Sequence, residues 1–246
     1  MMKNITFEVC VDTLEGAMIA INNGADRVEL CSALALGGLT PSAGLMKAAS
    51  KLQKPIYAMI RPRGGDFIFN FEEMDIMLHE IDRCREYELA GIVIGITHKN
   101  GALDYNKLRS LVDHADGLGV TLHRAFDVTP DPMEALEMAI DLKIERILTS
   151  GQKETAIEGA QMIGRVMESA KKRISIMPCS NINPGTVKSL LEIIDFSEIH
   201  SSCKSKLISP YEESAPSMAE GDDFTRTETD AKKVKALADY LKSLTI

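Results

Sequence analysis

The stretch Val120-Thr121-Leu122-His123-Arg124-Ala125-Phe126-Asp127 decides the fold. It begins as an apolar, β-branched run after a glycine-rich turn, which predicts a strand. It ends in polar residues just before Pro130, where a helix over 131–142 is expected. Because residues two apart in a strand share a face, this prediction places His123 and Asp127 on the same side. A strand that becomes polar only at its C-terminal end and then leads into a helix is typical of βα enzymes.

The same strand-then-helix unit recurs along the whole chain. The expected strands span 5–11, 27–31, 55–61, 91–96, 120–127, 146–149, 174–177 and 198–200. The expected helices span 14–22, 41–52, 71–88, 104–116, 131–142, 153–170, 184–194 and about 230–243. Strict alternation predicts a parallel sheet, and eight units at this length favour a closed (β/α)8 TIM-like barrel over an open doubly wound sheet. We therefore expect one α/β domain over 1–246.

A polar segment, about 203–228, is expected to form a loop between the last strand and the last helix. This loop follows a strand end, so it could fold over the barrel mouth and exclude water, as lids do in other barrels. The simpler alternative is a flexible connection to the last helix. The sequence leaves both alternatives open.

Composition narrows the class of protein. The chain has 246 residues, 45% of them hydrophobic and 26% charged, which is typical of a globular domain. A net charge of −8 argues against a nucleic-acid binder. No apolar run approaches the ~18 residues of a membrane span, and the N-terminus lacks the pattern of a signal peptide, so a cytoplasmic location is expected. The five cysteines form no CxxC or zinc-type pair and are expected to be reduced thiols.

Chemically useful side chains gather at the predicted strand ends. In a closed barrel the C-terminal ends of the strands share one mouth, where active sites of this fold lie. Strand parity brings to this mouth Glu8, Cys10, Glu29, Cys31, Met59, Arg61, Arg63, His123, Asp127, Ser150, Cys179, His200 and Ser202. Unpaired charges inside a barrel would be very costly, so Glu8, Glu29 and Arg61 are expected to form a buried ion-pair network around a wet pocket. The alternative is a purely structural network.

Two of these side chains have a functional and a structural interpretation. His123 could carry a proton, with a neighbouring carboxylate setting its tautomer, or it could be a buried histidine that orients a loop. Arg61 and Arg63 suit a phosphate or carboxylate ligand, although Arg61 could equally form a salt bridge with Glu29. The loops at 151–152 and 180–183 follow strands six and seven, where many barrels bind phosphate.

The cysteines also allow two interpretations. Thiolates are soft ligands that favour Cu(I), and Cys10 and Cys31 end adjacent strands, so they could supply two such ligands. The alternative is that each is a small apolar residue that fills the barrel core.

At these same residues the chain resembles the CutC family of cytoplasmic copper-homeostasis proteins. The matching stretches are Glu8-Val9-Cys10, Gly24 to Cys31, Gly37 to Ser42, Arg61 to Phe67, His123 to Asp127, Leu148 to Gly151 and Ile199 to Ser202. The resemblance implies a TIM-like barrel, often a homodimer, with Cys10 and Cys31 matching the family's proposed copper ligands. The chain departs from the family in the segment Pro178 to Asn183, where a glycine-rich turn is usual, and this puts a phosphate site there in doubt.

Two functions therefore follow from the sequence. The first is a copper-homeostasis protein that binds Cu(I) through Cys10 and Cys31. The second is a barrel enzyme that acts on a small anionic metabolite. Its hypothetical catalytic residues are Glu8, Glu29, Arg61, His123 and Asp127, and its hypothetical substrate-binding residues are Arg63, Ser150, His200 and Ser202.

Overall fold

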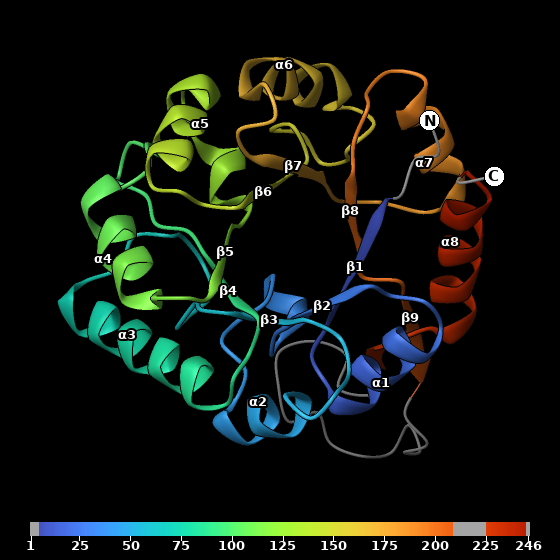
Figure 1. Ribbon diagram of the computed structural model, residues 1–246, viewed down its shortest axis with the longest axis horizontal. Coiled ribbons are helices and arrows are strands. Elements are labelled where there is room, and N and C mark those ends of the chain that lie inside the picture. The colour runs from blue at the N-terminus through green and yellow to red at the C-terminus, as the bar shows by residue number, and fades with distance from the viewer. Residues whose placement is uncertain (1–4, 209–224, 245–246) are drawn as a thin grey trace.

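The computed structural model describes residues 5–208 and 225–244, and in them the chain forms a parallel barrel surrounded by helices (Figure 1). Hydrogen-bonded neighbours follow the order β7-β6-β5-β4-β3-β2-β1-β8, and β7 contacts β8 to complete the ring. Every pairing in this sheet is parallel. The predicted (β/α)8 TIM-like architecture is thereby confirmed.

The barrel strands are short, and a helix packs outside almost every one. The strands are β1 Thr6–Val11, β2 Arg27–Leu30, β3 Ile56–Met59, β4 Gly91–Ile94, β5 Gly119–Leu122, β6 Arg146–Thr149, β7 Ser175–Pro178 and β8 Glu198–Ser201. The helices are α1 Leu14–Asn22, α2 Ala43–Ala49, α3 Phe71–Glu86, α4 Tyr105–Ala115, α5 Pro132–Asp141, α6 Ala160–Ala170, α7 Pro184–Leu191 and α8 Ala231–Ser243. None of the helices in the described part of the chain is long and apolar enough to cross a membrane.

The main hydrophobic core lies between the barrel and its helices. Alternate strand residues such as Val9, Val28, Ala58 and Ile92 are fully buried on the outer face of the barrel. Their apolar side chains pack against one stripe of each helix, as amphipathic helices require. The opposite strand residues point inward, so strand parity determines which side chains fill the barrel.

The stretch that predicted the fold leaves the strand earlier than expected. The strand β5 ends at Leu122, and a 3-10 helix η2 spans Arg124–Val128. The side chain of His123 accepts the backbone N–H of Ala125 and so caps this short helix. The prediction that His123 and Asp127 share one strand face was therefore wrong, because the cap turns the backbone out of the strand after His123.

Two predicted helices begin later than expected. The helix expected at 41–52 spans Ala43–Ala49, because the side chain of Ser42 caps it by accepting the N–H of Leu45. The helix expected at 153–170 begins at Ala160, after a series of turns.

The expected loop over 203–228 contains regular structure at both of its ends. An antiparallel pair forms there from β9 Lys204–Ile208 and β10 Thr225–Thr229, while residues 209–224 lie outside the described residues. The side chains of β9 are mostly exposed, so no apolar alternation marked it as a strand. The helix α8 follows, capped by Asp230.

A layer of charged and aromatic side chains lies inside the barrel near the N-terminal ends of its strands. The ring of Tyr57 lies between two guanidinium groups, 5.4 Å from Arg27 and 4.8 Å from Arg146. Both arginines donate to Glu198, at 2.5 Å and 3.1 Å. A Cβ at Gly91 would lie 2.2 Å from the Tyr57 ring, so this layer needs a glycine there. The charged groups of this layer are therefore paired with one another.

Candidate functional site

A cavity of about 830 Å³ opens at the C-terminal ends of the strands. The predicted site residues that line it are Cys10, Glu29, Arg61, His123, Asp127, His200 and Ser202. The predicted residues that do not line it are Glu8, Cys31, Arg63 and Ser150. A concave site with a few convergent polar groups is the usual form of a ligand pocket.

Glu8 is the buried centre of an ion network below the cavity. Its carboxylate accepts one hydrogen bond from Arg27 Nε and one from Nδ1 of His200, the second at 2.7 Å. Burial alone would raise the pKa of Glu8, but the hydrogen bond from His200 and the charge of Arg27 lower it to about 2. Glu8 is therefore ionised, and its two partners hold it in place rather than leaving it free to react.

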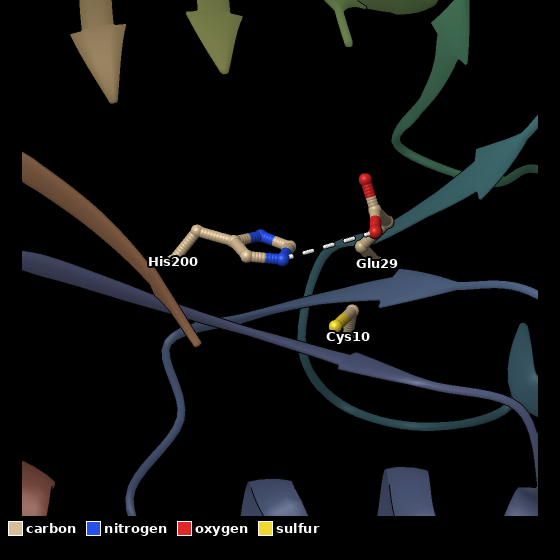
Figure 2. A group of neighbouring side chains, drawn as sticks. All are labelled: Cys10, Glu29 and His200. Atoms are coloured by element: carbon tan, nitrogen blue, oxygen red, sulfur yellow. Dashed lines mark ion pairs between the residues drawn. The ribbon is translucent and has the colours of Figure 1, made fainter. Parts of the chain in front are cut away.

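Cys10, Glu29 and His200 converge at one point of the cavity wall, as Figure 2 shows. Their ligand atoms all lie within 4.8 Å of one another, and Nε2 of His200 is 4.0 Å from Glu29 Oε2. Strand register explains this meeting, because Cys10 pairs with Glu29 across β1 and β2, while Glu8 pairs with His200 across β1 and β8. Thiolate, imidazole and carboxylate are all metal ligands in proteins.

The electrostatics of this group are dominated by His200. Burial alone would lower the pKa of His200, whereas the thiol of Cys10 and the carboxylate of Glu29 raise it well above its usual value. Burial also raises the pKa of Glu29. Nδ1 of His200 is hydrogen-bonded to Glu8, so the other ring nitrogen, Nε2, faces Glu29. A carboxylate that binds one ring nitrogen in this way commonly orients a histidine for metal binding through the other.

Cys31, the second predicted copper ligand, lies next to Glu29 but does not line the cavity. Cys31 is fully buried, and its thiol donates to Glu29 Oε2 at 3.6 Å. Burial and the nearby Glu29 raise the pKa of Cys31 well above its usual value. Both predicted cysteine ligands therefore lie next to Glu29, but of the two only Cys10 lines the cavity.

Arg61 does not join the expected ion-pair network. Its guanidinium donates to the backbone carbonyls of Leu36, Gly38 and Gly65, at 3.1, 3.1 and 2.9 Å. Among the described residues it forms no ion pair with a carboxylate, so the prediction that Arg61 pairs with Glu8 and Glu29 was wrong. The loops that wrap the guanidinium satisfy most of its N–H groups and leave its charge unneutralised beside the cavity.

His123 is a buried histidine held in one orientation. Its Nδ1 accepts the N–H of Ala125 at 3.0 Å, and its ring lies 4.8 Å from that of Phe67. Burial and the charge of Arg61 lower the pKa of His123 to about 3. The expected carboxylate partner that would set its tautomer is replaced by this backbone contact.

Asp127 and Ser150 hold the loop after β6. The carboxylate of Asp127 accepts from Thr149 Oγ1, from the backbone N–H groups of Ser150 and Gln152, and from Arg124 Nε. Ser150 is fully buried and also donates its hydroxyl to Asp127, at 3.0 Å. With its lone pairs so occupied, Asp127 shapes the cavity wall rather than offering a base.

Sequence reasoning misplaced one residue and missed others. Arg63 is turned toward the outside, where it pairs with Glu73 at 2.6 Å and Asp66 at 3.0 Å. The missed residues are Arg27, which holds Glu8, and Cys203 and Lys233, which line the cavity from beyond the last barrel strand. Only the polar character of Arg27 at the start of a predicted strand could have indicated its inward position.

Comparison with known proteins finds one protein family throughout. The model of the CutC family matches residues 5–205. A CutC family protein of Sinorhizobium medicae is 50% identical over 202 residues, which is 82% of either chain. One from Photobacterium profundum is 40% identical over 243 residues, which is 97% of this chain and 99% of that one. A crystal structure of CutC from Streptococcus agalactiae, described as a copper homeostasis protein, aligns with a TM-score of 0.77 at 32% identity, over 80% of this chain and 98% of that one.

Proposed function

The chain belongs to the CutC family, and from that membership we propose that it serves copper homeostasis by binding Cu(I) at the barrel mouth. The observation that carries this proposal is the convergence of Cys10, Glu29 and His200 within 4.8 Å on the cavity wall. Cu(I) prefers thiolate ligands and also accepts imidazole. We assign Cys10 and His200 as its ligands, with Glu29 as a weaker oxygen neighbour.

The buried polar atoms fit a metal ion at this point. Glu29 Oε1 has no hydrogen-bond partner among the described residues, although it is buried. Glu8 orients His200 through Nδ1, so Nε2 is the nitrogen that would face the ion. Binding requires Cys10 and His200 to lose their protons, and this predicts weaker binding at low pH.

Cys31 offers an alternative second ligand, as the sequence predicted. Its thiol would have to leave Glu29 and lose its proton in a fully buried position, which its raised pKa disfavours. We therefore expect Cys31 to matter less than His200. The proposed ligand pair is therefore Cys10 and His200 rather than Cys10 and Cys31.

A Cu(I) competition titration of the reduced protein tests both ligand sets. We expect Cys10→Ser and His200→Gln each to weaken Cu(I) binding by at least tenfold, and Cys31→Ser to weaken it less. Cys84→Ser is the matched control, because Cys84 is buried in the helix α3 far from the cavity lining. Copper binding that survives in the Cys10→Ser variant would refute the proposed site.

A second candidate function is an enzyme that acts on a small anionic metabolite. The specific observation in its favour is Arg61, a buried cation that lines the cavity without a carboxylate partner among the described residues. Such a charge is costly unless something neutralises it, and an anionic ligand would do so.

From family membership we also propose a cytoplasmic location and a homodimer. Light scattering of the purified protein would test the homodimer.

A further inference from the structure

Three buried polar atoms around the cavity have no hydrogen-bond partner among the described residues. They are Glu29 Oε1, Arg61 Nε and His123 Nε2, and all three residues line the cavity. Buried polar atoms in native proteins are nearly always paired, so each exception needs an explanation. The first belongs to the proposed copper site, whereas Arg61 and His123 follow β3 and β5, which supply none of the proposed copper ligands.

His123 is a fixed hydrogen-bond donor toward this region. Because its Nδ1 accepts the Ala125 N–H, the proton of the neutral ring must be on Nε2. With its pKa lowered to about 3 by burial and by Arg61, the ring stays neutral throughout the physiological range. His123 therefore offers one N–H and no charge.

Arg61 offers a charge and an unpaired Nε–H. Its Nη1 and Nη2 atoms donate to three backbone carbonyls, whereas its Nε has no hydrogen-bond partner among the described residues. The ring of Phe67 contacts both donors, 4.9 Å from the guanidinium carbon and 4.8 Å from the centre of the His123 ring. Phe67 thus fixes two donors from different strand ends around one apolar surface.

The rest of the lining favours an anion with a short apolar part. Lys204 and Lys233 reach the same cavity, and Lys233 Nζ donates to the Lys204 carbonyl rather than to a carboxylate. The cationic side chains of the lining outnumber its two carboxylates, Glu29 and Asp127, so the cavity attracts anions although the whole chain has a net charge of −8. Met59 and Leu148 supply apolar wall.

We propose that Arg61 Nε–H and His123 Nε2–H bind the two oxygens of the carboxylate of a short-chain organic acid. Two separate N–H donors, one charged and one neutral, match a planar two-oxygen anion. The proposal deepens the second candidate function by naming its ligand class, and it rests on that function rather than on copper binding. The ligand contacts only the Arg61 and His123 side of the mouth and needs no metal.

Calorimetric titration of the metal-free full-length protein with glycolate and with pyruvate tests the proposal. We expect binding of at least one acid, and at least tenfold weaker binding of the corresponding amide, which lacks the charge. Arg61→Gln and His123→Ala should each weaken acid binding by at least tenfold, because each removes a hydrogen bond to a charged group. Arg109→Gln is the matched control and should bind as the parent does, since Arg109 pairs with Asp113 on the exposed face of α4 and does not line the cavity.

Two measurements on the unmutated protein remain informative if a variant does not fold. Nitrogen-15 NMR should show His123 as the neutral Nε2–H tautomer, with its Nε2–H resonance shifted by the acid. Acid affinity should also be unchanged between pH 6 and pH 8. An imidazolium that held the anion by charge would instead bind more tightly as the pH falls through the ordinary histidine pKa of about 6.5.

The results that overturn the proposal are distinct from those that overturn the copper site. Failure of both acids to bind, equal binding by Arg61→Gln, or a histidine-like pH dependence would each refute carboxylate binding by this pair. Cys10→Ser should abolish tight Cu(I) binding and leave acid binding intact, so either proposal can fail while the other stands.

Discussion

The neutral variant Glu8→Gln should destabilise the protein far more than a matched change at its surface. The Glu8 side chain is 1% exposed and accepts charged hydrogen bonds from Arg27 and His200, which are 8% and 9% exposed. Glutamine keeps the shape but removes the anion that both cations share, so that Arg27 retains only Glu198. Removing one partner of a buried ion pair costs about 3–5 kcal/mol.

The pKa of Glu8 gives a similar magnitude. Its lowering from 4.5 to about 2 corresponds to about 3 kcal/mol of stability at neutral pH, at about 1.4 kcal/mol per unit. With a urea m-value of about 3 kcal/mol per molar, suited to a chain of this size, Glu8→Gln should lower the urea midpoint by about 1 M.

The control is Glu137→Gln, which also removes a glutamate from an arginine. Glu137 pairs with Arg173 at 2.6 Å, but the two side chains are 55% and 42% exposed. Exposed pairs are worth less than about 1 kcal/mol, so this midpoint should hardly move. Urea unfolding followed by circular dichroism measures both. A midpoint shift in Glu8→Gln no larger than that in Glu137→Gln would show that the buried network does not stabilise the fold.

Three further predictions follow from the same structure. Gly91→Ala should destabilise the protein by about 3 kcal/mol in the same urea assay, because the added Cβ would lie 2.4 Å from the backbone oxygen of Gly119. Its control, Gly44→Ala in α2, should be neutral or stabilising. Because the pKa of Glu8 is lowered in the folded protein, its stabilisation is present above about pH 5 and is lost as the pH falls toward about 2. The urea midpoint of the parent should therefore fall more steeply between pH 5 and pH 3 than that of Glu8→Gln. Burial raises the pKa of Cys84 to about 12, so mass spectrometry should find this thiol unmodified by iodoacetamide at pH 8 until urea unfolds the chain.

The barrel was predictable because its two periodicities are local. Strands buried on their outer face and helices with one apolar stripe leave separate signals in the sequence, and their alternation leaves few possible topologies. Strand parity also brought Cys10, Glu29 and His200 to one mouth, since these residues remain within or next to regular strand in the structure. These site residues were predictable for the same reason that the fold was.

The errors begin where the chain leaves regular structure. Asp127 lies within the 3-10 helix η2, which depends on a single side-chain cap, so strand parity does not apply to it. The partners of Arg61 are backbone carbonyls of loops, which no pattern of side chains encodes. Arg27 pairs with Glu8 and Glu198 only through the register of three strands, and this register is fixed by the closed barrel rather than by local sequence.

The order of strands around the barrel explains how one cavity can hold two kinds of ligand. The proposed copper ligands come from β1 and β8, which are neighbours, whereas Arg61 and His123 follow β3 and β5. Glu29 lies in β2, between β1 and β3, so in strand order it stands between the proposed copper ligands and Arg61, and it lines the same cavity. A bound carboxylate and the Glu29 carboxylate would repel each other, while a bound copper ion would reduce that repulsion. The two sites should therefore be coupled through Glu29, and Cu(I) should strengthen acid binding in the parent protein but not in Glu29→Gln.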